Sequence, residues 1–446
     1  MNSINEIKDD SMLYASFNQD NSFFSVGTER GFRIYQTYPF TNHYERLMNG
    51  GIGVVEMLYK SNFLALMGGG RVPKYSKNKL IIWDDHENKV ISELKFTTSI
   101  MNVKLKKDLL IVVCQKRIYV FDFNTYEIKD TIDTGDNKKE LIAVNGSPEF
   151  TILAFPSLKG VNKISIKNYE KRDIMTFSPQ DDSVSKIAMN NNGTLIVTAN
   201  ENGTIIRIHS CIDGALLQEF KRGHEKAKIN YICFDNDSKL MAVSSSRGTI
   251  HIFSMGSTIK KLKEHEKEKK NSEKKEKEKN ENIKEEKNKE EKIIEEQINK
   301  DLNKEEKKDK KEEKISENKE IEKNNEENKE INREINKEKE KGDEKKDNND
   351  KTKINNNNEE KNDDEDIKKE EELPENNKTF FGGLFGSQTE KSFARVRIKS
   401  QDSICAFVNN NLLVIISSDN KYYQAEIDIK KGGDCKIIFE DMLIKR

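Results

Sequence analysis

Residues Leu240–Phe253, LMAVSSSRGTIHIF, contain the unit that decides the fold of this chain. The apolar run LMAV is followed by a polar turn, SSRG at Ser245 to Gly248, and then by the alternating residues of GTIHIF. Alternation with a period of two is typical of a half-buried strand, and a short turn that contains glycine joins two strands into a hairpin. The stretch therefore predicts two antiparallel strands.

The second half of this unit recurs along the chain. A Gly, Asn or Lys turn precedes alternating apolar residues in RGFRIY, NKLIIWD, KRIYVFD, NKISI, GTIIRIH, GTIHIF and NKYYQA. The first apolar positions of these units are Phe32, Leu80, Ile118, Ile164, Ile206, Ile250 and Tyr422. They lie 38 to 48 residues apart, except the last two, which a charged insert separates.

Seven units of about 45 residues match the length of a four-stranded propeller blade. The sequence therefore predicts an all-β protein, a seven-bladed β-propeller of the WD-repeat type. Two β-sandwiches are the alternative, but they leave the regular spacing unexplained.

The insert from Lys260 to Lys378 consists almost entirely of Lys, Glu, Asn and Asp. Low hydrophobicity over such a length cannot offset the entropy of ordering, so we expect this segment to be disordered. It leaves the sixth unit and returns to it, and the cost of closing a loop grows only slowly with its length. We expect a first part of the propeller over 1–258, a disordered insertion over 259–378, and the end of the blade-six loop with the rest of the propeller over 379–446.

Composition and motifs exclude several classes of protein. The five cysteines stand singly, which predicts free thiols in a reducing compartment. The N-terminal MNSINEIKDD has no signal-peptide pattern, and no apolar run is long enough to span a bilayer. HExxH, GxSxG and P-loop motifs are absent, and basic residues of the globular part are mixed with acidic ones. We expect a cytoplasmic protein that is not an enzyme, takes no cofactor or metal, and binds no nucleic acid.

One apolar cluster follows the charged insert. The stretch TFFGGLFG, from Thr379 to Gly386, contains Phe380, Phe381, Leu384 and Phe385 without a charged residue. Aromatic side chains on a flexible loop are suited to a lipid interface, so we expect them to insert into a membrane. The alternative is that the cluster folds back onto blade six as a small satellite core.

A pair of cations, Lys221 and Arg222, lies between two strand patterns in Phe220–Gly223. Successive side chains of an extended segment point to opposite faces, so the two cations are expected to diverge toward separate anions. Hydroxyl-rich hairpins precede and follow the pair, and hydroxyl groups donate to phosphate oxygens. The alternative is a solvated basic pair at a strand end. The polar residues of the two hairpins are Thr198, Thr204 and Arg207 before the pair, and Ser244, Ser245, Thr249 and His251 after it.

With these motifs the sequence resembles the PROPPIN family, the phosphoinositide-binding β-propellers of the autophagy machinery. The family hallmark is Phe or Leu followed by Arg-Arg-Gly, and here the four residues are Phe220 to Gly223. INYICF and DNDSKLMAVSSSRGTIHIF downstream, ASFNQDNSFFSVGTERGFRIY near the N-terminus, and SFARVRI, ICAF and KYYQ near the C-terminus are similar to the family as well. The resemblance covers nearly all of the globular part.

The resemblance implies two headgroup sites on the propeller rim, for phosphatidylinositol 3-phosphate and the 3,5-bisphosphate. By motif position, the first site is expected to use Thr198, Thr204, Arg207 and Lys221. The second is expected to use Arg222, Ser244, Ser245, Thr249 and His251. The family also implies a membrane-inserting blade-six loop, a lipid-transfer partner of autophagy, and a peripheral location on autophagosomal, endosomal or vacuolar membranes.

Three residues depart from the family pattern, and all fall on the first site. Lys221 replaces the first hallmark Arg and so lacks the planar fork of a guanidinium. Asn200 stands where Ser is usual, and Gln180 stands where His is frequent. The alternative function is therefore a protein-interaction scaffold of the WD-repeat type whose lipid sites have decayed.

Overall fold

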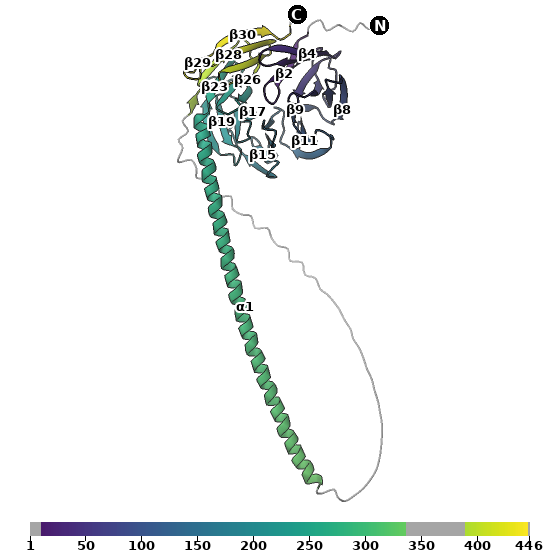
Figure 1. Cartoon of the computed structure of the whole chain (residues 1–446), viewed down its shortest axis with the longest axis vertical. Helices are drawn as coiled ribbons and strands as arrows, with labels where there is room; N and C mark the ends of the chain where they lie inside the picture. The colour runs from purple at the N-terminus through teal and green to yellow at the C-terminus, as the bar shows by residue number, and fades with distance from the viewer. Residues whose placement is uncertain (1–9, 336–388, 445–446) are drawn as a thin grey trace. The chain divides into compact units, whose positions relative to one another are not determined.

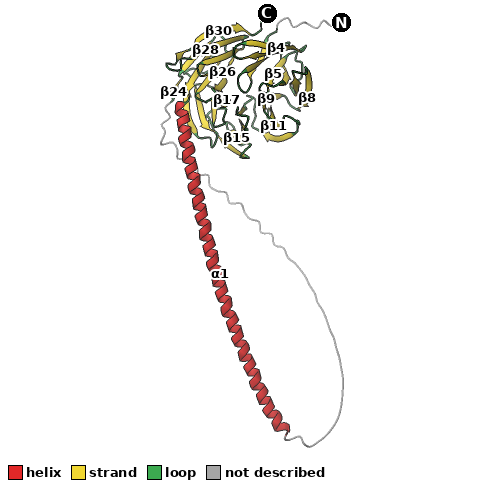
Figure 2. Ribbon diagram, viewed as in Figure 1, coloured by secondary structure: helices red, strands yellow, loops and turns green. Residues whose placement is uncertain are grey.

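The strands form a ring of seven sheets in the computed structural model, which describes residues 10–335 and 389–444 (Figure 1). Each sheet has four or five strands, and the first three strands of every sheet follow one another along the chain. The predicted seven-bladed β-propeller is thus confirmed. Figure 2 shows that this part of the molecule consists mainly of strands joined by loops and turns.

The bounds of the strands in blades one to four are as follows. Blade one contains β1 (Met12–Phe17), β2 (Phe23–Thr28), β3 (Gly31–Gln36) and β4 (Thr41–Leu47). Blade two contains β5 (Ile52–Met57), β6 (Phe63–Gly68), β7 (Lys79–Asp84) and β8 (Lys89–Lys95). Blade three contains β9 (Ile100–Lys106), β10 (Leu109–Cys114), β11 (Arg117–Asp122) and β12 (Ile128–Asp133). Blade four contains β13 (Ala143–Val144), β14 (Ile152–Pro156), β15 (Ile164–Asn168) and β16 (Asp173–Phe177).

Blades five and six each carry a short fifth strand at the outer edge. Blade five contains β17 (Val184–Met189), β18 (Leu195–Asn200), β19 (Ile205–Ser210), β20 (Leu216–Lys221) and β24 (Glu390–Lys391). Blade six contains β21 (Ile229–Phe234), β22 (Leu240–Ser245), β23 (Thr249–Ser254), β25 (Ala394–Arg397) and β29 (Gly433–Asp434). Blade seven contains β26 (Ser403–Asn409), β27 (Leu412–Ser417), β28 (Lys421–Glu426) and β30 (Lys436–Met442).

The core lies between neighbouring blades. Met241 and Val243 of β22 pack against blade five, whereas Ala242, between them, packs against blade seven. Both faces of a middle strand are covered in this way, and β22 is buried along its whole length. The period-two pattern of the sequence therefore fills two interfaces at once.

Aromatic packing closes the ring between the first and the last blade. Tyr422 of blade seven stacks on Phe40 of blade one with a centroid distance of 4.1 Å, and its hydroxyl donates to the carbonyl oxygen of Thr37 at 2.6 Å. Phe24 and Tyr35 of blade one belong to the same buried cluster. Side-chain packing rather than a shared strand joins the two ends of the propeller.

The charged insertion leaves blade six where the sequence predicts. It begins after β23, the third strand of the blade, and the chain returns through β24 to β25, the fourth strand. The described part of the insertion is helix α1 (Gly256–Ile335), which differs from the expected disorder. Lys and Glu have high helix propensity, and pairs such as Lys274 with Glu278, 3.9 Å apart, support a helix one turn at a time.

The first turns of α1 belong to the propeller, and the unit formed by residues 268–381 is separate from it. Leu262 is buried in the cluster between blades five and six, and Ile259 packs against the same cluster. Lys261 donates to Oε1 of Gln218 at 2.5 Å, and His265 pairs with Asp213 at 2.8 Å. The expected boundary at residue 258/259 therefore lies within the helix, before its apolar contacts with the propeller.

Candidate anion-binding rim of blades five and six

Hairpins of blades five and six carry the candidate residues. Thr198 lies on β18 and Arg207 on β19, with Thr204 in the turn between them; Lys221 ends β20. Ser244 and Ser245 end β22, and Thr249 and His251 lie on β23 of the next blade. Arg222 follows β20 in the linker that joins the two blades.

Arg207 is held by two carboxylates. Its Nε lies 2.7 Å from Oε1 of Glu219, the residue opposite it on β20, and its Nη2 lies 2.8 Å from Oδ2 of Asp181. Burial opposes the charge, but both carboxylates favour it, so the pKa of Arg207 is raised. A phosphate at this position would compete with Asp181, which is 89% exposed, more readily than with Glu219, which is 13% exposed.

The neighbouring polar residues of blade five are bonded to one another. Gln180 donates from Nε2 to the hydroxyl of Thr198 at 2.8 Å and to its carbonyl oxygen at 3.1 Å, and Thr198 is fully buried. Asn200 accepts the backbone N–H of Gly203 at 3.0 Å. Two of the three residues that depart from the family pattern thus have structural partners.

Lys221 lies on the same face of blade five as Arg207. It pairs with Ile205, two residues before Arg207 on β19, and side chains two residues apart share a face. Its ammonium group makes no hydrogen bond or ion pair with any residue that the structure describes, and its side chain is half-buried. Of the cations on this face, Lys221 is therefore the more available to a ligand.

Arg222 is bonded to backbone carbonyl oxygens and so fixes the linker between blades five and six. Its Nε donates to the carbonyl oxygen of Gly203 at 2.8 Å, its Nη2 donates to the carbonyl oxygen of Glu225, and only 5% of the residue is exposed. Burial, and then the charge of Arg247, lowers its pKa. The two adjacent cations thus differ in their surroundings: Arg222 is bonded to backbone carbonyls, whereas Lys221 has no such bond among the described residues.

The serines of blade six are also engaged internally. Ser244 is fully buried and donates to the carbonyl oxygen of Ser403 at 2.7 Å, which joins blade six to blade seven. Ser245 donates to the carbonyl oxygen of Thr249 at 3.2 Å, across the hairpin. Their hydroxyls position the end of the hairpin.

His251 lies at the centre of a group of cations. Burial, followed by the charges of Arg222, Arg395 and Arg397, lowers its pKa to about 4. Nδ1 of His251 lies 3.2 Å from the hydroxyl of Ser392. An anion bound here would offset the mutual repulsion of these cations.

Arg395 and Arg397 are the site residues that sequence reasoning missed. They lie on β25 directly opposite His251 and Thr249, whereas the alternate residues Ala394 and Val396 are buried. Arg395 pairs with Asp434 at 2.5 Å, and Arg397 is exposed without a hydrogen bond or ion pair in the described part of the chain. The alternation of small or apolar residues with Arg in ARVR was the available signal, because it places both guanidinium groups on one face.

The cations of the rim are suited to binding an anion. No group of His, Cys, Asp or Glu in the described ranges is arranged to hold a metal. No helix among the described residues is long and apolar enough to cross a membrane. The expected membrane-inserting residues Phe380, Phe381, Leu384 and Phe385 lie outside the described residues.

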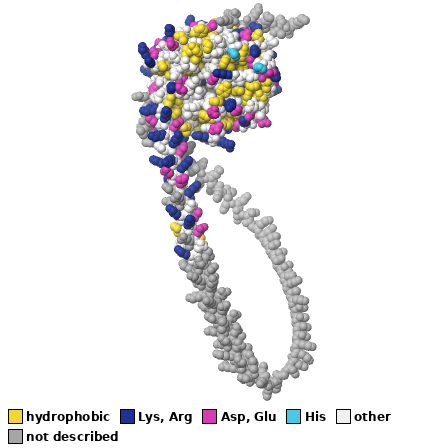
Figure 3. Space-filling model, viewed as in Figure 1, with side chains coloured by type: hydrophobic (Ala, Val, Ile, Leu, Met, Phe, Trp, Pro, Cys, Tyr) yellow, Lys and Arg dark blue, Asp and Glu magenta, His cyan; other side chains and the backbone are white. Residues whose placement is uncertain are grey.

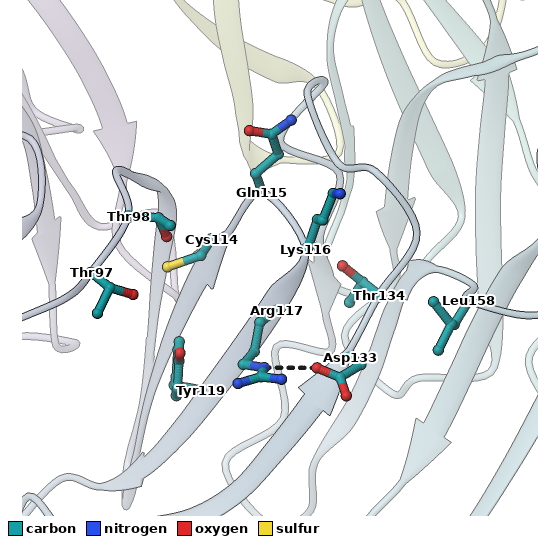
Figure 4. A pocket seen from close by; sticks show the side chains of 10 residues that line it. All are labelled: Thr97, Thr98, Cys114, Gln115, Lys116, Arg117, Tyr119, Asp133, Thr134 and Leu158. Atoms are coloured by element: carbon teal, nitrogen blue, oxygen red, sulfur yellow. Dashed lines mark hydrogen bonds and ion pairs between the residues drawn. The ribbon is translucent and has the colours of Figure 1, made fainter.

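A separate hollow of about 520 Å³ lies at blades two to four (Figure 4). Arg117 in its wall pairs with Asp133 at 2.7 Å, and burial raises the pKa of the Cys114 thiol. Arg395 of the blade-six group is likewise paired with a carboxylate, but Arg397 beside it has no ion pair among the described residues.

Comparisons with known proteins identify the family and the fold of the chain. The PROPPIN family model matches residues 11–270. Autophagy-related protein 18 of Komagataella pastoris is 31% identical over 288 residues, which cover 56% of this chain and 53% of that protein. SVP1-like protein 2 of Pichia angusta is 33% identical over 252 residues, or 55% of this chain and 70% of that protein. The chain thus spans about half the length of the first of these relatives.

Solved structures share the fold. The crystal structure of Kluyvelomyces marxianus Hsv2 aligns with a TM-score of 0.61 at 16% identity, over 98% of this chain and 100% of that chain. A complex of KlAtg21 with the coiled-coil of AgAtg16 aligns with a TM-score of 0.60 at 18% identity, over 97% of this chain and 100% of that chain. The family model matches more than half of the sequence, so the chain belongs to the PROPPIN family.

Proposed function

We propose that this protein is a non-catalytic effector that binds 3-phosphorylated phosphoinositides and is thereby recruited to membranes in autophagy-related membrane biogenesis or trafficking. The single observation that carries the proposal is the group of three arginines around His251. Guanidinium groups form bidentate, charge-assisted hydrogen bonds with phosphate oxygens. Phosphatidylinositol 3-phosphate and the 3,5-bisphosphate are the proposed ligands.

In this proposal two sites each bind a lipid headgroup. The second site, with Arg222, Thr249 and His251, gains Arg395 and Arg397 as further cations from β25. The first site relies on Lys221, because Arg207 must first exchange a carboxylate for the phosphate. Two weak sites and the proposed insertion of Phe380 to Phe385 act together by raising the effective concentration of each contact.

The proposal extends to partners and location. An autophagy lipid-transfer protein is the proposed partner, and autophagosomal, endosomal or vacuolar membranes are the proposed location. One relative of known structure was solved with a coiled-coil, so a coiled-coil segment is a second partner class to test.

A protein-interaction scaffold is the competing function. It is favoured by the internal bonds of Thr198 and Ser244 and by the two carboxylates on Arg207. Flotation of the full chain on phosphatidylcholine liposomes with and without phosphatidylinositol 3-phosphate or the 3,5-bisphosphate separates the two. Binding that requires the 3-phosphorylated lipid supports the effector, and absence of binding to all of these liposomes favours the scaffold.

A further inference from the structure

The outermost strand of blade seven exposes large apolar side chains. Strand β30 has the sequence KIIFEDM, and its Ile437, Ile438, Phe439 and Met442 are each 37 to 47% exposed. Ile429, in the loop before β29, is 53% exposed. Figure 3 shows hydrophobic side chains at the surface of the propeller, with Lys and Arg around its rim. Ile437 and Met442 lie on one face of the strand and Phe439 on the other, so both faces of this outer edge are apolar; the edge is called the patch below.

Three lysines lie at the beginning of this patch, whereas Glu440 and Asp441 lie near its other end. Lys430, Lys431 and Lys436 are exposed, and their ammonium groups have no hydrogen bond or ion pair with the described residues. The nearest acid in the loop, Asp428, accepts the backbone N–H groups of Lys430 and Lys431, which lowers its pKa. Glu426 faces Lys436 across the strand pair. Apolar side chains with a basic border fit an anionic lipid surface.

The patch is continuous with the rim of blade six. Strand β29 leaves the same loop and pairs with β25, and its Asp434 pairs with Arg395 at 2.5 Å. Arg395 in turn lies opposite His251. A membrane that meets the cations of blade six therefore lies next to the edge of blade seven.

A hollow of about 330 Å³ lies beside the strand, between blades six and seven. Lys399, Lys421, Tyr423 and Ile437 line it, and Glu440 pairs with Lys421 at 2.5 Å. Its mixture of cationic and apolar walls matches the boundary between lipid headgroups and acyl chains.

The backbone of β30 is poorly suited to an added strand. Gln424 pairs with Phe439 and Ala425 with Ile437, so Ile438 is bulged out of the ladder. Bulges and edge lysines block the pairing of a further strand. The exposed side chains, not the backbone edge, are what a partner meets here.

We infer that the outer edge of blade seven, formed by β30 and the loop at Ile429 to Lys431, is a membrane-contact surface for anionic lipids. This inference rests on the proposed function, because recruitment by 3-phosphorylated lipids brings the edge to the bilayer. The contact itself requires negative charge and an apolar interior, not a 3-phosphate. It adds a contact on the side of the rim away from blade five.

The test uses the full chain with Ile429→Ser and Ile438→Ser combined. Liposomes of phosphatidylcholine with phosphatidylinositol 3-phosphate are compared with the same liposomes that also contain phosphatidylserine. We expect phosphatidylserine to strengthen binding of the wild type, and the double variant to lose most of this gain, roughly tenfold in affinity from the lost apolar contact. A second variant, Lys430→Gln with Lys431→Gln, is expected to lose the gain as well.

A matched control is available on blade two. Val90 and Ile91 of its outer strand β8 are 43% and 41% exposed, and Val90→Ser with Ile91→Ser is expected to bind as the wild type does. If the blade-seven variants keep the full gain from phosphatidylserine, the inference is overturned and the patch serves a protein. If the wild type does not bind liposomes with the 3-phosphorylated lipid alone but binds those with phosphatidylserine through blade seven, the proposed function is wrong. The inferred contact surface is then still supported.

Discussion

Nε of Arg222 donates to the carbonyl oxygen of Gly203 over 2.8 Å, which ties the linker between blades five and six to the hairpin turn of blade five. The guanidinium also holds the carbonyl oxygen of Glu225, so one side chain fixes both segments. The neighbouring Lys221 has no such role. Stability and ligand binding therefore depend differently on the two adjacent cations.

Replacing Arg222 with Ala is expected to reduce both stability and binding. The lost hydrogen bonds from a charged donor contribute about 1.5–3 kcal/mol to the free energy of unfolding, measured by urea denaturation. Lys221→Ala is expected to change stability by less than about 0.5 kcal/mol. In flotation on 3-phosphoinositide liposomes, Arg222→Ala should bind more weakly than Lys221→Ala, and the double variant should hardly bind. Undiminished binding by a folded double variant would contradict both site assignments.

Neutralising Asp181 is expected to strengthen binding at the first site. Asp181→Asn removes the exposed carboxylate that pairs with Arg207 at 2.8 Å, and so releases a guanidinium for phosphate. The affinity for 3-phosphoinositide liposomes should rise severalfold, because an exposed ion pair such as this one contributes at most about 1 kcal/mol that the phosphate must otherwise overcome. Asp182→Asn makes the same charge change at the next residue and is the control. Equal effects of the two variants would show that only net charge matters there.

Acid is expected to destabilise the propeller through His209, which is 4% exposed. Burial lowers its pKa to about 4, whereas the unfolded chain has a His pKa of about 6.5. As the pH falls from about 6.5 to about 4, the unfolded state takes up a proton that the folded state does not. The free energy of unfolding should fall by about 3 kcal/mol over this range.

Urea denaturation at several pH values measures this loss. His209→Gln should remove that part of the pH dependence, whereas His86→Gln, whose side chain is 80% exposed, should not. Identical pH profiles for wild type and His209→Gln would contradict the prediction.

The start of α1 is expected to matter for folding, and the rest of the insertion is not. Deleting residues 268–378 should leave the thermal midpoint nearly unchanged, because these residues belong to a separate unit or lie outside the described part. Deleting 260–378, by contrast, removes Leu262 from the cluster between blades five and six. Leu262→Ala alone should cost about 2 kcal/mol in urea denaturation. Equal midpoints for the two deletions would show that the packed turns contribute nothing.

The aromatic cluster after the insertion is expected to insert into the membrane and to strengthen binding to it. Replacing Phe380, Phe381, Leu384 and Phe385 with Ser should weaken liposome binding, since each buried side chain contributes about 1–3 kcal/mol of apolar transfer. Circular dichroism should show an unchanged fold. A variant that unfolds would place the cluster in the core of blade six instead. High salt should weaken the liposome binding of the wild type but leave the part of the binding that the aromatic residues provide.

The sequence by itself determined the blades and the place of the insertion. Strand alternation and hairpin turns depend on neighbouring residues, so GTIHIF and its six counterparts specify their strands locally. The alternation also assigns faces, which is why Lys221 and Arg222 were expected to diverge. Helix α1 differs from the expected disorder because low hydrophobicity argues against a packed core, whereas Lys and Glu pairs along the chain support a helix without one.

Only the tertiary structure decided which partners the side chains have. Arg395 lies opposite His251 because β25 completes a blade whose first three strands, β21 to β23, precede the insertion, so the pairing joins segments far apart in the chain. The carboxylates on Arg207, the bond from Arg222 to Gly203 and the exposure of β30 likewise follow from how hairpins and blades pack. Periodicity specifies the face on which a side chain lies. What that face meets depends on the closure of the ring, which no local stretch of sequence contains.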